Sequence, residues 1–206
     1  MIGGTGNDTY YVDSQYDSVI EGVGEGYDHI YTSYFFDMPF NIEVVTIIGD
    51  APVIITGNNL DNTLRGNDAA NTLRGGYGAD TLTSFGGDDL IYGGPGDDVM
   101  TGGAGSDLFQ YVELVDSTAS RPDLITDFDG AVDTIDLSQL DANTGVGGNQ
   151  AFVWVDAFSS QAGQATLTYS AVTDRTMLAL DANGDGVAEF KVEIAGNISG
   201  DSGFIL

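Results

Sequence analysis

The chain of 206 residues contains no cysteine, one histidine and five basic residues. Without cysteine, neither disulfides nor thiolate-bound zinc can hold the fold together. The single histidine, His29, excludes the two-histidine helix motif of zinc proteases. Because Lys and Arg are so few, nucleic acid and anionic membrane surfaces are poor partners for this chain.

Long apolar runs are also missing. No segment is apolar enough to span a bilayer, and no basic and then apolar start resembles a secretory signal peptide. We therefore expect no nucleic-acid partner and no membrane insertion, and export would require another kind of signal.

Acidic residues, in contrast, are abundant. Asp and Glu number 32, and the formal net charge is −27. Such a chain repels itself when it compacts without counter-ions. With neither thiolates nor a histidine cluster, the available ligands are hard oxygens, which favour calcium or magnesium over zinc.

Glycine recurs in register. From Gly57 the chain divides into six consecutive blocks of nine residues, GNNLDNTLR, GNDAANTLR, GGYGADTLT, SFGGDDLIY, GGPGDDVMT and GGAGSDLFQ. The sixth position of each block is Asp or Asn, and the eighth is a large apolar residue. Glycines allow a tight turn in the first six positions, and the last three form a short strand with one buried side chain. The pattern predicts a β-solenoid with two blocks per coil.

Turns on the same edge of this solenoid lie 18 residues apart. Asp80 should therefore face Asp98, and Asp89 should face Asp107. Calcium fits such a gap because it accepts six to eight oxygens in flexible geometry, whereas magnesium demands a tighter octahedron. Asn62 and Asn71 occupy the same position with less charge, so we expect weak calcium binding there or none.

The blocks GGYGADTLT, GGPGDDVMT and GGAGSDLFQ resemble the hemolysin-type calcium-binding repeat of the RTX family. The later segments DLITDFDGAVDTIDLSQL and DANGDGVAEFKVEI resemble the C-terminal domain of serralysin-type metalloproteases. The resemblance implies an all-β fold, a right-handed parallel β-roll (β-solenoid) of calcium-binding nonapeptides with a C-terminal β-rich cap. It also implies several Ca²⁺ ions.

In that family, turn carbonyls and the repeat Asp bind the ion together. SFGGDDLIY departs from the pattern, since Ser84 and Phe85 replace two glycines. Carried over, the resemblance implies the ligands Asn62, Asn71, Gly75, Gly76, Tyr77, Gly78, Asp80, Gly87, Asp89, Gly93, Gly94, Pro95, Gly96, Asp98, Gly102, Gly103, Ala104, Gly105 and Asp107.

Another repeat opens the chain. Residues 3–11 read GGTGNDTYY, and a looser copy surrounds Asp28, so Asp8 and Asp28 are expected to share an ion with help from Gly3, Thr5 and Gly26. Residues 41–59 are expected to form solenoid without calcium. We divide the chain into N-terminal partial coils at 1–56, the calcium-binding β-roll at 57–110 and a cap at 111–206. Because Met1 and Ile2 end an incomplete block, we expect an upstream part of a larger polypeptide.

The cap offers two further candidates. Asp127 follows the roll and is the candidate, among Asp127, Asp133 and Asp136, for completing the final calcium site. Asp181, Asn183 and Asp185 match the first half of an EF-hand loop, but Val192 stands where the closing Glu belongs. An acidic hairpin turn is the alternative for this loop.

We expect no enzyme activity, because the repeat accounts for nearly all paired carboxylates and no Gly-x-Ser-x-Gly elbow occurs. The ending GDSGFIL resembles the acidic and then hydrophobic end that RTX proteins present to the type I secretion apparatus. The resemblance implies a secreted, extracellular domain that folds on calcium. Alternatives are an accessory module of an extracellular metalloprotease or polysaccharide-modifying enzyme, or of a surface adhesin.

Overall fold

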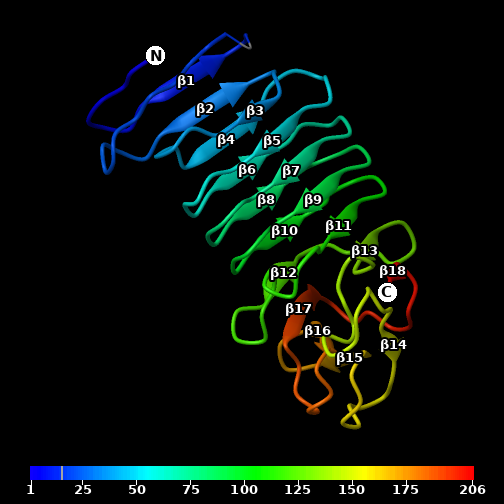
Figure 1. The fold of residues 1–206 in the computed structure, drawn as a ribbon. Coiled ribbons are helices and arrows are strands. Elements are labelled where there is room, and N and C mark those ends of the chain that lie inside the picture. The colour runs from blue at the N-terminus through cyan, green and yellow to red at the C-terminus, as the bar shows by residue number, and fades with distance from the viewer. Residues whose placement is uncertain (15) are drawn as a thin grey trace.

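The computed structural model describes residues 1–14 and 16–206, and within them it contains 18 strands and no helix. Figure 1 shows an elongated roll that runs from the blue N-terminal strands to the green ones and ends against a yellow and red cap. The roll consists of two parallel sheets whose strands alternate along the chain. The predicted all-β roll with a β-rich cap is confirmed.

The first sheet has 11 strands and continues into the cap. In spatial order its strands are β1 (Thr9–Val12), β2 (His29–Thr32), β4 (Val44–Ile47), β6 (Thr63–Arg65), β8 (Thr81–Thr83), β10 (Val99–Thr101), β12 (Asp123–Ile125), β17 (Phe190–Ala195), β16 (Arg175–Asp181), β15 (Gln164–Ser170) and β14 (Val153–Trp154).

The second sheet has seven strands and closes the other side of the roll. In spatial order its strands are β18 (Phe204–Ile205), β13 (Thr134–Asp136), β11 (Leu108–Gln110), β9 (Leu90–Tyr92), β7 (Thr72–Arg74), β5 (Ile54–Thr56) and β3 (Phe36–Asp37).

The middle residue of each short strand points inward. Leu64 pairs with Leu82, which pairs with Met100, and all three are buried. On the opposite sheet Leu73, Ile91 and Phe109 form a matching buried column. Burying one such side chain stabilises the fold by about 1.5–3 kcal/mol, so the eighth position of the block builds the core.

The cap covers the C-terminal end of the roll. Strand β17 pairs in parallel with β12 and antiparallel with β16, so the roll sheet passes directly into the cap. The ring of Tyr111 lies edge-on against Phe190 at 5.0 Å, and Trp154 lies edge-on against Phe204 at 5.4 Å between ring centroids. These aromatic contacts fill the junction. The pairing of β17 with β12 leaves the first sheet of the roll without an open edge at this point.

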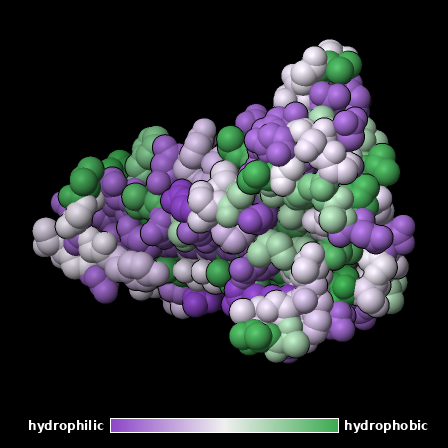
Figure 2. Space-filling view, turned by 90° about the horizontal axis from the view of Figure 1, so that it is seen from below, coloured by the Kyte–Doolittle hydropathy of each residue, from purple (hydrophilic) through white to green (hydrophobic). Residues whose placement is uncertain are grey.

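Hydrophilic and hydrophobic residues are interspersed on the face shown in Figure 2. Within the described residues no helix could cross a membrane. Both sheets continue through residue 56 and also past residue 110 into the cap, so the domain boundaries expected at these two residues stay predictions.

Candidate metal centres

The glycine-rich turns bring backbone carbonyls of neighbouring coils together. Gly76 and Gly94, at the second position of their blocks, have φ of 109° and 93°, which side chains rarely tolerate. A Cβ on Gly94 would collide with the carbonyl oxygen of Gly76, and one on Gly96 would collide with that of Gly78. The turns can stack so closely only because these positions are glycine.

A ladder of side chains follows the edge that we call edge one, formed by the turns before β6, β8, β10 and β12. The amide of Asn62 donates to Asp80 Oδ1 at 2.7 Å, and the amide of Asp80 donates to Asp98 Oδ1 at 2.8 Å. The amide of Asp98 in turn donates to Asp123 Oδ1 at 2.9 Å. Each carboxylate therefore links its own turn to the turn before it.

Edge two, formed by the turns before β7, β9, β11 and β13, repeats this arrangement. The amide of Asn71 donates to Asp89 Oδ1 at 2.6 Å, and the amide of Asp89 donates to Asp107 Oδ1 at 3.0 Å. The amide of Asp107 donates to Asp133 Oδ1 at 3.0 Å. The spacing of 18 residues thus places Asp80 beside Asp98 and Asp89 beside Asp107.

The second oxygen of each repeat carboxylate has no partner. Asp80 and Asp98 are each 1% exposed, and their Oδ2 atoms are buried without a hydrogen bond, as are those of Asp89 and Asp107. Burial raises the pKa of Asp80 to about 7 and that of Asp98 to about 8. A buried carboxylate oxygen without a partner is unfavourable unless a proton or a cation neutralises it.

These oxygens lie against the turns. A Cβ on Gly75 would collide with Asp80 Oδ2 and lie within 2.5 Å of the Gly93 carbonyl oxygen, and one on Gly93 would collide with Asp98 Oδ2. Unpartnered carboxylate oxygens therefore share their surroundings with backbone carbonyls. This all-oxygen donor set fits calcium.

In the turns that carry Asn62 and Asn71, both polar atoms of the asparagine side chain have a hydrogen-bond partner. Asn62 Oδ1 accepts the amide of Asn58 at 2.8 Å, and Asn62 Nδ2 donates to the carbonyl of Ile42 at 3.1 Å. Asn71 makes the equivalent pair of bonds to Asn67, both at 2.9 Å. A side-chain amide thus satisfies both of its ends within the protein.

Comparison with known proteins assigns the family. The family model described as "Peptidase M10 serralysin C terminal" matches residues 1–206. The chain belongs to this serralysin C-terminal family. Serralysin from Proteus mirabilis is 40% identical over 99 residues, which are 48% of this chain and 20% of that protein. The endo-1,3-1,4-beta-glycanase ExsH from Rhizobium meliloti is 38% identical over 65 residues, 32% of this chain and 14% of that protein.

Two solution structures resemble the serralysin-type domain described here. Both are subunits of the Azotobacter vinelandii mannuronan C5-epimerase. One has a TM-score of 0.56 at 30% identity and covers 76% of this chain and 92% of its own. The other has a TM-score of 0.54 at 27% identity and covers 73% and 80%. The family likeness expected from the repeat is confirmed, and this chain spans about a fifth or less of the curated relatives that it matches.

In this serralysin C-terminal domain, two acids continue the ladders past the last repeat. Asp123 extends edge one and Asp133 extends edge two, at spacings of 25 and 26 residues. Asp123 Oδ2 is buried without a partner, and burial raises the pKa of Asp123 to about 9. Asp127, which we chose from the sequence, instead accepts the amides of Gly102 and Gly103 at 3.0 and 2.7 Å.

The repeat pattern did not single out Asp123 from the sequence. Only the alternation of outward and inward side chains in DLIT, residues 123–126, matches a repeat block. Asp123 is the first residue of β12 and sits where the sixth position of a block would be, but the turn before it is longer than a repeat turn. Aligning the strand rather than the turn would have found it.

The loop after β16 also gathers acids. The nearest carboxylate oxygens of Asp181, Asp185 and Glu189 lie within 4.8 Å of one another. Glu189, at the ninth position of the loop, accepts the amide of Ala182 at 2.8 Å, and Asp181 accepts the amides of Gly184 and Gly186. An EF-hand comparison misses Glu189 because it searches the twelfth position, where Val192 is buried in β17.

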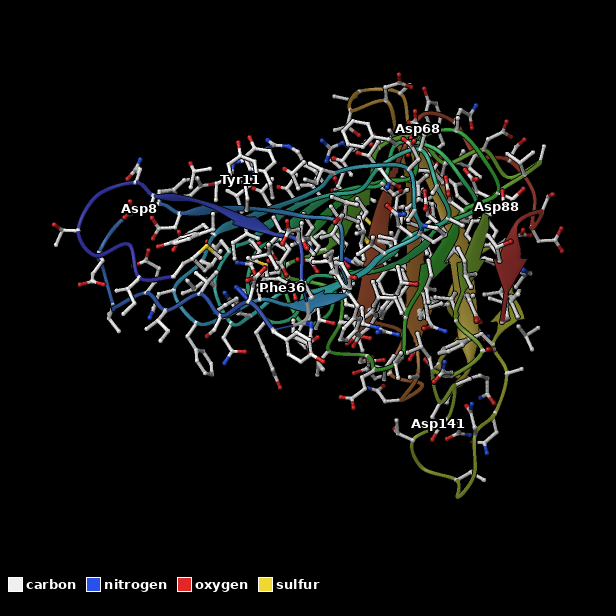
Figure 3. All side chains as sticks on the ribbon, turned by 90° about the horizontal axis from the view of Figure 1, so that it is seen from above. Asp8, Tyr11, Phe36, Asp68, Asp88 and Asp141 are labelled. Atoms are coloured by element: carbon white, nitrogen blue, oxygen red, sulfur yellow. The ribbon has the colours of Figure 1, made fainter. Side chains whose placement is uncertain are left out.

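At the N-terminal end, the amide of Asp8 donates to Asp28 Oδ1 at 2.8 Å, so these two repeats are neighbours as expected. Figure 3 shows Asp8 at the far end of the roll from the cap. Glu43 accepts the amide of Asp28 at 2.7 Å and continues edge one into the segment for which no calcium was expected. No catalytic domain is evident within the described residues.

Proposed function

We propose that this chain is a calcium-binding, non-enzymatic domain that folds when it meets extracellular calcium and stabilises a larger secreted protein. The observation that supports the proposal is the row of buried, unpartnered carboxylate oxygens along both edges of the roll. No other described feature neutralises them, because the two ion pairs among the described residues, Arg121–Asp97 and Arg175–Glu193, lie outside the row.

Calcium would neutralise these oxygens and connect neighbouring turns. On edge one we propose a site between Asp80 and Asp98, with the carbonyls of Gly75, Tyr77, Gly94 and Gly96 as further ligands. We propose a second site between Asp98 and Asp123. Edge two would provide sites between Asp89 and Asp107 and between Asp107 and Asp133. Asp127 and the loop of Asp181, Asn183 and Asp185 remain secondary candidates.

The energetic effect of these sites is large. If free calcium exceeds the dissociation constant of a site tenfold, that site adds about 1.4 kcal/mol to the free energy of unfolding. Four sites in the roll and one at Asp8 and Asp28 would add roughly 7 kcal/mol, which is comparable to the whole stability of a typical domain. Calcium would therefore decide whether the aspartate region of the roll is folded.

The difference in free calcium concentration between the cytosol and the outside would then allow the domain to fold only outside the cell. Extracellular calcium modules bind with dissociation constants of about 0.1–1 mM, far above cytosolic free calcium. The domain would remain unfolded inside and fold after passage through the type I secretion apparatus. The C-terminus supports this order, since Phe204 pairs with Ile135 in β13 and the amide of Leu137 donates to Ile205 at 2.8 Å. A secretion machine could bind this end only before the domain folds.

The relatives suggest the kind of parent protein. Their printed names are proteases and a glycanase, of which this chain matches only a small part. We propose that the chain is the C-terminal accessory module of a secreted protease or polysaccharide-modifying enzyme, whose catalysis resides in another part of the protein.

A calcium titration followed by circular dichroism tests the calcium proposal. We expect a cooperative gain of β signal that magnesium at the same concentration does not produce. Asp98→Asn should move the midpoint to higher calcium, because Asp98 lies between two proposed sites. Asp68→Asn is the matched control, since Asp68 is exposed on a turn of the roll and has no described hydrogen bond to its carboxylate (Figure 3). A chain that is fully ordered in excess chelator at neutral pH would contradict the proposal.

A further inference from the structure

Glu21 lies one coil after Gly3 at the N-terminal end of the roll, outside every repeat turn predicted from the sequence. Ile20 pairs in parallel with Ile2, which places Glu21 directly beside Gly3 in the neighbouring coil. Glu21 is only 7% exposed. A Cβ on Gly3 would collide with Glu21 Oε1 and lie 2.5 Å from Asp8 Oδ2, so glycine at this position makes room for two carboxylates.

Three carboxylates meet at this point. The nearest carboxylate oxygens of Asp8, Glu21 and Asp28 lie within 4.8 Å of one another, and Asp28 is 1% exposed. Asp8 Oδ2 and Glu21 Oε2 are buried without a hydrogen-bond partner. Tyr10 donates its hydroxyl to the other oxygen of Glu21. The hydrogen bond from Tyr10 orients Glu21 and leaves Oε2 free.

No basic side chain balances this charge. Neither of the two ion pairs among the described residues involves the cluster. Three carboxylates within 4.8 Å, two of them buried and one half-buried, repel one another strongly unless a cation lies between them. Burial and the neighbouring Glu21 and Asp8 also raise the pKa of Asp28, which agrees with a site that lacks its positive partner.

We propose that Asp8, Glu21 and Asp28 form a calcium site of a different type from the repeat sites. A side-chain carboxylate from Glu21 takes the part that a glycine carbonyl takes at the first position of a repeat turn. The inference rests on the proposed calcium binding of the domain. With three carboxylates instead of two, this site should retain calcium at lower free concentrations than the roll sites, because affinity rises with the number of charged ligands.

Magnesium fits this cluster less well than calcium. Magnesium usually keeps several water molecules and binds through one or two carboxylates. A cluster with two carboxylates almost fully buried has little room for that water, whereas calcium exchanges its water for protein oxygens in flexible geometry.

The test measures calcium bound per chain at low free calcium, by native mass spectrometry of the 206-residue chain. We expect wild type to retain one tightly bound ion and Glu21→Gln to lose it. Asp13→Asn is the matched control, because Asp13 is exposed on the same segment and the substitution removes the same charge as Glu21→Gln. Terbium adds a second readout, since emission excited through tyrosine should fall in Glu21→Gln and in Tyr10→Phe, whereas Tyr10→Phe should keep its calcium ion.

A merely structural role for Glu21 is distinguishable by thermal unfolding. Glu21→Gln should lower Tm in calcium and leave it unchanged or raised in chelator, because the substitution removes an unbalanced buried charge. An equal loss of Tm in both conditions, or an unchanged count of bound ions, would overturn the inference. If Asp98→Asn still shifts the calcium titration in that case, the proposed function stands; if wild type binds no calcium, both fail.

Discussion

Two neighbouring regions of the roll share one backbone plan and close their turns by different means. Residues 57–74 use Asn62 and Asn71, whose side-chain amides satisfy both ends by hydrogen bonds. Residues 75–110 use aspartates whose Oδ2 atoms are buried and unpartnered. The strands of both regions pair in the same register over equally buried side chains, so core packing does not distinguish them.

The comparison shows that one repeat can close its turn with hydrogen bonds inside the protein or leave a buried carboxylate oxygen without a partner. A neutral amide both donates and accepts, so it completes the turn from within the protein. A carboxylate only accepts, and it needs an external positive partner when it is buried. We therefore expect a single change of residue type at the sixth position to select between the two.

Removal of calcium should separate the two regions most strongly. In excess chelator at neutral pH, we expect the amides of Asp80 and Asp98 to lose their protection against hydrogen exchange. The amides of Asn58 and Asn67 should lose less, because their acceptors need no metal. The measurement is hydrogen exchange by mass spectrometry with and without calcium. Equal loss in both regions would show that the asparagine coil depends on calcium as much as its neighbours.

A change of pH should reproduce part of this difference. Burial raises the pKa of Asp80 to about 7 and of Asp98 to about 8, from 3.8. In chelator, the protonated forms stabilise the folded roll below about pH 4, and this stability is lost as pH rises through about 7–8. With calcium the sign reverses, because protons compete with the ion for the same oxygens.

Urea unfolding at pH 5 and pH 8 measures this effect. In chelator the midpoint should be higher at pH 5, whereas with calcium it should be higher at pH 8. Asp98→Asn should reduce the pH dependence in chelator. The effect should be smaller than that of calcium, since a proton neutralises a carboxylate but does not join two turns.

Converting an asparagine turn tests whether the sixth position suffices. Asn62→Asp should destabilise the metal-free protein by about 1–3 kcal/mol, because it removes the hydrogen bond to Ile42 and buries an unpaired charge. Added calcium should recover part of that loss. Thermal unfolding with and without calcium measures both, and Asn59→Asp is the control for the added charge, because Asn59 is exposed on the same turn. A variant as stable as wild type in chelator would show that the turn tolerates a bare carboxylate.

The smallest effect should come from the irregular turn of the aspartate region. Phe85 occupies the second position of its block with φ of 75°, where the other aspartate turns have glycine. Phe85→Gly should raise the free energy of unfolding by about 0.5 kcal/mol, since relief of left-handed strain slightly exceeds the entropy cost of glycine. Tyr77→Gly is the control, because Tyr77 is also exposed but has no positive φ. An equal gain in both variants would exclude strain as the cause.

The sequence by itself determined the roll. Glycine, Asp and a large apolar residue recur at constant intervals from residue 57, and each position has a local role in the turn, the edge or the core. Because two blocks make one coil, the spacing of 18 residues also determined that Asp80 lies beside Asp98. Local repetition of this kind needs no knowledge of distant contacts.

Only the tertiary structure decided where the irregular acids lie. Asp123 and Asp133 join the ladders at separations of 25 and 26 residues from the preceding aspartate, instead of 18. Glu21 reaches Asp8 because Ile20 pairs with Ile2. Glu189 joins Asp181 because the hairpin between β16 and β17 returns it to the loop. In each case strand pairing brings the carboxylate into place, and the loop between the paired strands has no fixed length that a sequence pattern could reveal.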